Sequence, residues 1–296
     1  MKLIFIKLIV ALIFYNFGTL FYYCRNNDEE DAMLLDYSLL FWDIDGTLID
    51  GKQVLPSVSD WMKLMRRENK QMYFVTNHPI RSKEAHCKYL NKIGLPIELN
   101  ELITPIDALQ CFFQSVQKPF SVYPACSVMI KEQLEQWNIP IINRVHQERK
   151  NIYIVLGLSF TSNYRMLQKV FSLIQRGAKL VVLNEDFSCP FNGERMLDTG
   201  AFLTIYQQSG ALKEEPISVG KPSIWMQQVL RKKMQSSTGK SVIIGDSLLT
   251  DIAIGNALHI DTIWLTNGAR HSEDVKAKPT FVYESLKDIL LEKHYL

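Results

Sequence analysis

The sequence predicts an α/β protein whose core is a Rossmann-like, doubly wound parallel sheet. Short apolar runs that are typical of buried strands alternate with segments in which apolar residues recur at helical spacing. Acidic, hydroxyl or amide side chains directly follow several of the strand-like runs, and ligands bind at that edge of open α/β sheets. The chain has 296 residues, 47% of them hydrophobic, which is enough for one large core or two modest ones.

Strand-like and helical segments alternate through the first part of the chain. In segment 57–69 the apolar residues recur at helical spacing, from Val58 through Met62 to Met65, which predicts an amphipathic helix. A second helix is expected at 81–93 and ends before Gly94, a residue type that favours the helix C-terminus. The other expected elements of this part are strands at 39–42 and 71–75 and a helix at 106–116.

A second alternating block follows the first. It begins with a short expected strand at 120–123 and ends near Pro216. Its patterned segments are 152–158, 164–175, 177–183 and 201–208. Because strands that alternate with helices build parallel sheet units, this block predicts a second α/β domain.

Two carboxylates, Asp43 and Asp45, lie one residue apart at the end of the first strand-like run. In an extended strand both side chains point the same way, because the side-chain period is two. Neighbouring carboxylates repel each other unless a positive group lies between them, and a divalent cation is the obvious candidate. Gly46 and Thr47 supply a turn after the strand, so a surface turn without a ligand is the alternative interpretation.

Three later segments carry polar side chains in comparable positions. They are Thr76 and Asn77 after a β-rich run, Lys221 in a turn, and Asp246 with Asp251 after the apolar run 242–244. Each has a structural alternative: the end of a strand for Thr76 and Asn77, a solvated loop lysine for Lys221, and a helix N-cap for Asp251.

In order, these segments resemble the four motifs of the haloacid dehalogenase superfamily of aspartyl-phosphate hydrolases, and the resemblance covers about residues 37–290. The block between the second and third motifs resembles the large α/β cap of the subfamily of p-nitrophenyl, phosphoglycolate and pyridoxal phosphate phosphatases. The resemblance implies a core domain in two parts, 37–118 and 215–296, with an inserted α/β cap domain at 119–214 and a separate amino-terminal segment at 1–30.

The resemblance also implies a chemical role for each motif residue. Asp43 is the implied nucleophile, which forms an aspartyl-phosphate. Asp45 is the implied acid, which protonates the leaving oxygen and then takes a proton from water. Thr76, Asn77 and Lys221 are the implied ligands of the phosphoryl group.

Mg²⁺ is the implied cofactor, held by Asp43, the backbone carbonyl of Asp45, and Asp246. Asp251 is expected behind these ligands, and direct ligation stays open. Dehalogenases of the superfamily lack the second acid, so Asp45 indicates a phosphoric monoester hydrolase or a mutase, and the cap resembles that of hydrolases. We therefore expect a magnesium-dependent phosphatase for a small phosphorylated metabolite. The alternative is a membrane-tethered, non-catalytic binding protein of the same fold.

The sequence does not predict which metabolite is the substrate. Asn184-Glu185-Asp186 resembles the acid-bearing loop of the cap subfamily, but segment 196–201 lacks the usual glycine-rich approach to the next helix. Cys189 lies in loop 187–195, where some relatives place a substrate-contacting histidine. Phosphoglycolate, pyridoxal phosphate, sugar phosphates and nucleotides therefore all stay open. A homodimer also stays open, since cap-mediated dimers occur among such relatives.

Composition excludes some function classes. The net charge of +2 and the lack of a long basic stripe give no support for a nucleic-acid partner. The five cysteines are scattered without a Cys-x-x-Cys pair, which favours reduced thiols over a disulfide framework.

The amino-terminal segment 3–23 is strongly apolar, with Lys2 and Lys7 near its start and acidic residues at 28–31 after it. We expect an uncleaved membrane anchor, since its length approaches the roughly 20 residues of a membrane span. A secretory signal and a non-spanning extension are the other interpretations. The two lysines would keep the terminus cytosolic and place the catalytic domain across the membrane. Members of the subfamily that this chain resembles are mostly cytoplasmic, so a cytoplasmic location is the alternative.

Overall fold

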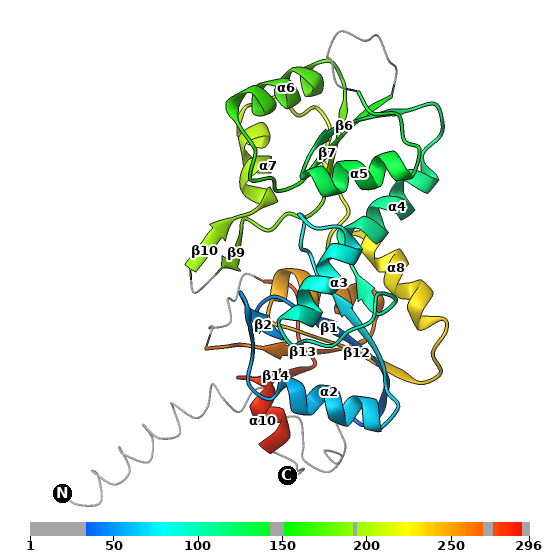
Figure 1. The fold of residues 1–296 in the computed structure, drawn as a ribbon, viewed down its shortest axis with the longest axis vertical. Coiled ribbons are helices and arrows are strands. Elements are labelled where there is room, and N and C mark those ends of the chain that lie inside the picture. Colours follow the sequence, from blue (N-terminus) through cyan, green and yellow to red (C-terminus); the bar gives the residue numbers. More distant parts are fainter. Residues whose placement is uncertain (1–33, 143–150, 192–193, 269–274, 292–296) are drawn as a thin grey trace, which may run out of the picture. The chain divides into compact units, whose positions relative to one another are not determined.

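The computed structural model of the chain describes residues 34–142, 151–191, 194–268 and 275–291 (Figure 1). Its larger sheet has six parallel strands in the order β14-β13-β12-β1-β4-β5. These strands are β1 (Tyr37–Asp43), β4 (Gln71–Val75), β5 (Leu102–Ile103), β12 (Lys240–Gly245), β13 (Asp261–Leu265) and β14 (Phe281–Tyr283). The α/β fold class with a parallel core sheet is therefore confirmed.

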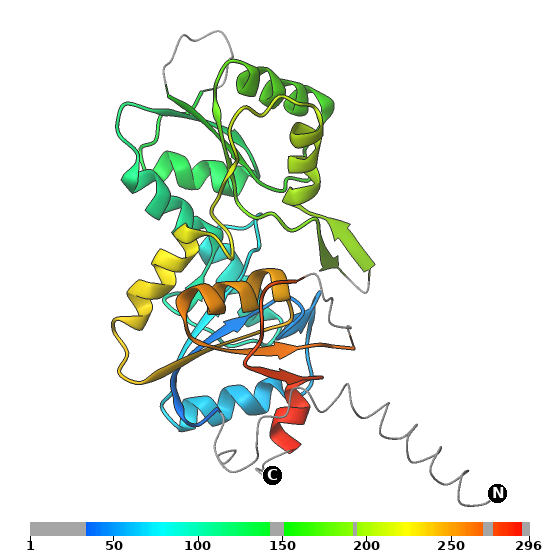
Figure 2. The ribbon, with the colours of Figure 1, turned by 180° about the vertical axis from the view of Figure 1, so that it is seen from behind.

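The larger sheet is covered on both faces, as a doubly wound sheet must be. Leu39 and Phe41 of β1 pack in one cluster with residues of α4 (Pro105–Ser115), α8 (Ile224–Met234) and α9 (Ala253–Leu258). Leu40 and Trp42 are equally buried and point to the opposite face, because side chains alternate along a strand. Figure 2 shows α9 on one side of this sheet and α2 (Val58–Arg67) and α10 (Leu286–Leu291) on the other. The Trp61 indole donates to the carbonyl of Leu286 at 3.0 Å and joins α2 to α10.

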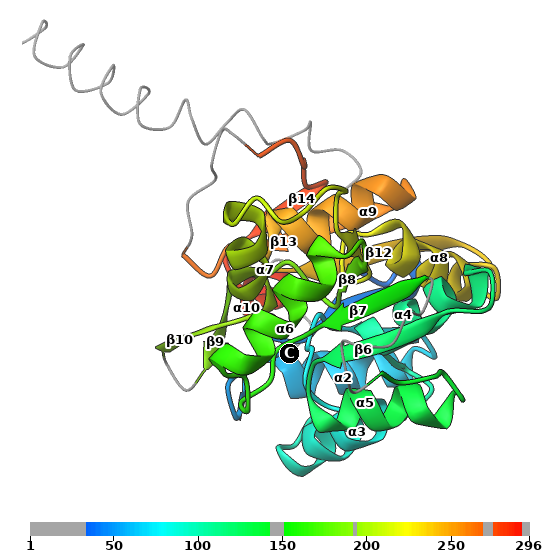
Figure 3. The same ribbon diagram turned by 90° about the horizontal axis from the view of Figure 1, so that it is seen from above.

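The second sheet is built from the block inserted between the two parts of the core. Its four parallel strands run in the order β11-β8-β7-β6. They are β6 (Ser121–Ala125), β7 (Ile152–Leu156), β8 (Lys179–Val182) and β11 (Ile217–Ser218). Residues of α6 (Tyr164–Gln175) and α7 (Thr199–Gln208) pack on one face and α5 (Val128–Gln136) on the other (Figure 3). The inserted α/β cap is thus present, while the exact bounds expected for the domains stay a prediction.

The local sequence explains where individual helices begin and end. The Ser82 hydroxyl accepts a hydrogen bond from the Ala85 amide and caps α3 (Lys83–Lys92). Gly94 follows α3 with φ +97°, as expected of the glycine at its end. Thr104 and Asp107 form a capping box at the start of α4.

Two antiparallel hairpins were not expected. One joins β2 (Ile49–Asp50) to β3 (Gln53–Val54), just after the Asp43 turn. The other pairs β9 (Ser188–Phe191) with β10 (Glu194–Leu197); it takes up most of the loop expected at 187–195 and extends two residues beyond it. Strands this short leave no clear alternating pattern, and Pro190 is an unusual strand residue, so neither hairpin could be predicted from local patterns.

Within the described ranges, no helix is both long and apolar enough to cross a bilayer. The segment 3–23, for which we expect an anchor, lies outside those ranges.

Candidate active site

At the centre of the candidate site a buried ammonium group lies between two carboxylates. The Lys221 Nζ donates to Asp43 Oδ1 and to Asp251 Oδ1, each at 2.6 Å, and to the Val75 carbonyl at 3.0 Å. Lys221 is only 3% exposed. Three acceptors use all three hydrogens of the ammonium, so its position is fully determined.

The sheet brings these groups together. Asp43 is the last residue of β1 and pairs with Val75, the last residue of β4. Lys221 follows β11 and precedes α8. Asp251 lies in the short π-helical turn Leu248–Ile252 after β12. Asp251 is therefore inside a helical turn and does not serve as the N-cap that was its alternative interpretation.

The three carboxyl groups of Asp43, Asp246 and Asp251 cannot all be ionised without repulsion, because the single charge of Lys221 offsets only one of them. Burial and the nearby Asp43 raise the pKa of Asp246 to about 8 and that of Asp251 to about 7. Burial alone would lower the pKa of Lys221, but Asp251 and Asp43 outweigh it and raise that pKa above its usual value. An additional cation at this position would therefore relieve repulsion among the acids.

The donor set fits a hard divalent cation. Asp43, Asp246 and Asp251 each offer one carboxylate oxygen, and these oxygens all lie within 4.8 Å of one another. Asp43 Oδ2 is buried and has no hydrogen-bond partner in the described part of the chain. Both oxygens of Asp251 are already engaged, Oδ1 by Lys221 and Oδ2 by the Ser247 amide at 3.1 Å. Oxygen ligands of this kind suit Mg²⁺.

Gly46 lies in the turn that follows β1 and allows this turn to approach Asp246 closely. Its φ is +91°, and a Cβ placed there would lie 2.3 Å from Asp246 Oδ2. The Trp264 indole donates to the Asp246 carbonyl at 2.8 Å and fixes that loop from the other side. The turn and the acid are therefore packed against each other without room for a side chain.

Asp45 lies beside Thr76, which was expected as a ligand of the phosphoryl group. The Thr76 hydroxyl donates to Asp45 Oδ2 at 3.2 Å. Burial, followed by the Asp43 charge, raises the pKa of Asp45 to about 6. An acid with such a pKa is suited to exchange protons near neutral pH.

Asn77 lies in the site, but its side chain is occupied by protein groups. Its Nδ2 donates to Asp186 Oδ2 at 2.9 Å and to the Lys221 carbonyl at 3.3 Å. Its Oδ1 accepts from the Lys221 amide at 2.7 Å. The Asn184 side chain donates to the Asn77 carbonyl at 2.8 Å.

Asn184 and Asp186 were not among the expected site residues. Both follow β8 in the inserted block, at the acid-bearing loop whose sequence resembled that of the cap subfamily. That similarity was the available signal, but only the folded chain shows that this loop reaches Asn77.

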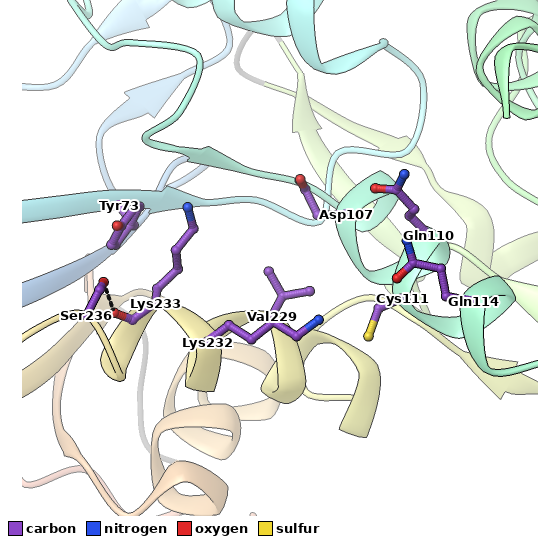
Figure 4. A pocket seen from close by; sticks show the side chains of 9 residues that line it. All are labelled: Tyr73, Asp107, Gln110, Cys111, Gln114, Val229, Lys232, Lys233 and Ser236. Carbon is purple, nitrogen blue, oxygen red and sulfur yellow. Dashed lines mark hydrogen bonds between the residues drawn. The ribbon is translucent and has the colours of Figure 1, made fainter.

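A separate open pocket of about 430 Å³ lies between α4 and α8 (Figure 4). Its lining includes Tyr73, Asp107, Lys232 and Lys233, with the Lys233 ammonium 4.7 Å from the centre of the Tyr73 ring. None of the expected site residues lines it, so it is distinct from the acidic cluster.

Two models of known protein families match parts of this chain. A family model described as haloacid dehalogenase-like hydrolase matches residues 40–140, and a related hydrolase-like model of that family matches residues 218–289. The first match includes Asp43 and extends into the inserted block, while the second begins within β11 and includes Lys221. The chain therefore belongs to the haloacid dehalogenase-like hydrolases. Within them it is a phosphatase of the cap-containing subfamily and a phosphoric monoester hydrolase.

Two curated relatives illustrate the range of the subfamily. A sugar-phosphatase of Bacillus subtilis is 25% identical over 250 residues, which are 83% of this chain and 90% of the relative. Phosphoglycolate phosphatase 2 of Arabidopsis thaliana is 24% identical in an alignment of 303 positions, which covers 93% of this chain and 95% of the relative.

Two solved structures share the fold. The 4-nitrophenylphosphatase of Thermotoga maritima matches with a TM-score of 0.74 at 21% identity, covering 87% of this chain and 98% of that one. A glycerol phosphate phosphatase of Mycobacterium tuberculosis in complex with magnesium matches with a TM-score of 0.74 at 20% identity, covering 86% of this chain and 76% of that one.

Proposed function

We propose that this protein is a magnesium-dependent phosphatase that hydrolyses a small-molecule phosphomonoester through an aspartyl-phosphate on Asp43. The observation that carries the proposal is the environment of Asp43: one oxygen is held by the Lys221 ammonium, and the other is buried without a partner in the described chain. A carboxylate fixed on one side and free on the other is oriented for attack on an electrophile.

In the first step, a free Asp43 oxygen attacks the phosphorus and the bond to the leaving oxygen breaks. Lys221 holds positive charge beside Asp43 and the transferred group, which offsets negative charge in the transition state. Asp45, whose pKa is raised to about 6, gives a proton to the leaving oxygen. Thr76 orients the Asp45 carboxyl through its hydroxyl.

In the second step, water attacks the phosphorus of the aspartyl-phosphate. Asp45, now a carboxylate, takes a proton from that water, and the bond between phosphorus and the Asp43 oxygen breaks. Inorganic phosphate leaves and both acids return to their starting states.

The residues that would hold Mg²⁺ are Asp43, Asp246 and the backbone carbonyl of Asp45, with Asp251 fixed behind them by Lys221 and Ser247. When bound, the ion would neutralise charge on the phosphoryl oxygens.

The proposed substrate is a small phosphorylated metabolite. The names of the relatives refer to sugar phosphates, phosphoglycolate and 5′-nucleotides, which share only the phosphoryl group. The core residues described above would contact that shared group, so the inserted cap would choose among leaving groups. Homodimer formation stays a prediction.

Phosphate release from a panel of phosphomonoesters tests this function. The purified full-length chain is assayed with Mg²⁺ and with chelator, together with Asp43→Asn and, as a matched control, the exposed Asp50→Asn. We expect metal-dependent release that Asp43→Asn lowers by at least about a thousandfold, since the nucleophile is lost, and that Asp50→Asn leaves unchanged. A folded wild-type chain that releases no phosphate would favour the non-catalytic binding protein.

The membrane anchor expected at 3–23 is a separate proposal. Partition of the full-length chain between membranes and the soluble fraction tests it, with alkaline extraction to separate an inserted segment from a loosely bound one. Complete extraction would refute an anchor.

A further inference from the structure

The Asn77 side chain contacts both backbone polar groups of Lys221, its amide and its carbonyl. Its Oδ1 accepts from the Lys221 amide at 2.7 Å, while its Nδ2 donates to the Lys221 carbonyl at 3.3 Å. The other end of Lys221 is the ammonium between Asp43 and Asp251. Asn77 thus fixes the backbone from which the catalytic ammonium is extended.

This two-point contact works in only one orientation of the amide. If the Asn77 amide were turned over, its oxygen would face the Lys221 carbonyl and its NH₂ would face the Lys221 amide, so both contacts would be lost. Asp186 selects the productive orientation, because an ionised carboxylate accepts hydrogen bonds and cannot donate them. It accepts from the second hydrogen of Asn77 Nδ2 at 2.9 Å.

The segment that carries Asp186 is itself held firmly. The Gly200 amide donates to the Asp186 carbonyl at 2.9 Å, and a Cβ at Gly200 would lie 2.2 Å from the Glu185 carbonyl oxygen. Asn184 is fully buried and donates to the Asn77 carbonyl as well as to Asp198 at 3.3 Å. The start of α7 therefore braces the segment against Asn77.

Gly220, directly before Lys221, allows the chain to pass close to Asn77 and to the end of β8. A Cβ there would lie 2.6 Å from the Leu183 carbonyl and 2.8 Å from Asn77 Oδ1. The Lys221 turn, the Asn77 amide and the segment after β8 are therefore in close contact at one point.

We propose that Asp186 is a positioning residue of the cap, which orients the Asn77 amide and thereby places the Lys221 ammonium against Asp43. The inference rests on the proposed phosphatase function and adds to it a dependence of the core chemistry on the cap. Lys221 is positioned for phosphoryl transfer only while the segment after β8 is seated on Asn77.

Activity of Asp186 variants tests this role. We expect Asp186→Ala to lower kcat about tenfold, the usual cost of losing a hydrogen bond to a charged group, with KM changed less than about threefold. Asp186→Asn keeps an acceptor oxygen and should recover most of that kcat. Glu185→Ala removes a neighbouring exposed acid and serves as the matched control, with wild-type kinetics expected. Wild-type kcat in Asp186→Ala would overturn the proposal.

A double-mutant cycle tests whether Asp186 acts through Asn77. In an Asn77→Ala background, adding Asp186→Ala should change kcat by less than about twofold, because the amide that Asp186 orients is already gone. If the two substitutions lowered kcat by the product of their separate effects, Asp186 would not act through Asn77 and the proposal would be overturned.

Hydrogen exchange of the Lys221 amide gives a readout that needs no turnover. This amide donates to Asn77 Oδ1 and should exchange faster in Asp186→Ala than in the wild type or in Glu185→Ala. Unchanged exchange would overturn the inference. A wild-type chain without phosphatase activity would instead refute the proposed function and leave this test of the contact intact.

Discussion

Lys221 and Asp43 are 178 residues apart in the chain, yet the ammonium of one lies 2.6 Å from the carboxylate of the other. The inserted sheet occupies most of the sequence between them. The pair therefore forms only when both parts of the core sheet have come together around the insertion. Its burial also makes it a sensitive point for stability, because neither charge can be solvated if its partner is lost.

Replacement of Lys221 by glutamine should destabilise the fold. Lys221→Gln leaves Asp43 and Asp251 buried without their shared cation, and breaking a buried pair typically costs about 3–5 kcal/mol. Urea unfolding at neutral pH in chelator measures this free energy, and added Mg²⁺ should restore part of it. Lys213→Gln, at an exposed position, is the control and should unfold like the wild type. Equal midpoints for Lys221→Gln and the wild type would contradict the prediction.

A glycine comparison separates backbone strain from damage to the site. Gly46 and Gly177 have similar positive φ values, +91° and +89°, but only a Cβ at Gly46 would meet Asp246. Alanine at either position should lower the free energy of unfolding by about 1–2 kcal/mol, because a residue with a Cβ is strained in the left-handed conformation. Only Gly46→Ala should also abolish phosphate release, since it displaces a proposed metal ligand. If both variants kept wild-type turnover, the close approach of Gly46 to Asp246 would have no functional role.

The sequence predicted the fold more completely than it predicted the contacts of the site. The strand expected at 71–75 was confirmed to the residue as β4, and the patterned segment 164–175 coincides with α6, because the apolar patterns of both are regular. The β9–β10 hairpin was missed, since four-residue strands containing a proline leave no periodic signal.

Within the site, the motifs indicated which core residues meet, and the structure places Asp43, Lys221 and Asp251 in direct contact. The motifs did not show that the Asn77 amide is used by Asp186 and Lys221. Such a contact joins segments more than a hundred residues apart, 109 for Asn77 and Asp186, and local patterns do not encode the geometry of that approach.

Magnesium affinity should distinguish Asp246 from Asp251. Asp246→Asn removes a proposed ligand, so we expect a larger rise in the Mg²⁺ dissociation constant than for Asp251→Asn. Asp251 is held by Lys221 and Ser247 behind the ligands, and loss of such a partner typically weakens metal binding about 10–100-fold. Calorimetric titration of Mg²⁺ into each variant measures both effects, with exposed Asp60→Asn as the control. The reverse order would indicate that Asp251 binds the ion directly.

His86 should make the protein less stable as the pH falls. It is 2% exposed, its ring meets that of His78 edge-on at 4.5 Å, and its Nδ1 has no partner in the described chain. Burial, with a smaller effect of the Arg81 charge, lowers its pKa from 6.5 to about 3. Between these two values the unfolded chain binds a proton that the folded chain does not. The contribution of His86 is therefore fully present above pH 6.5 and is lost progressively toward pH 3.

Unfolding in urea at several pH values between 7 and 4 checks this contribution. Buried acids with raised pKa values, such as Asp45 and Asp198, act in the opposite direction, so the comparison must be made between variants. Relative to His86→Gln, the wild type should lose about 1.4 kcal/mol of unfolding free energy per pH unit below pH 6. His259→Asn is the control, because His259 is exposed and its left-handed backbone, φ 58°, suits asparagine. If the wild-type and His86→Gln curves ran parallel, the pKa of His86 would be the same in the folded and the unfolded chain, and its burial would carry no penalty.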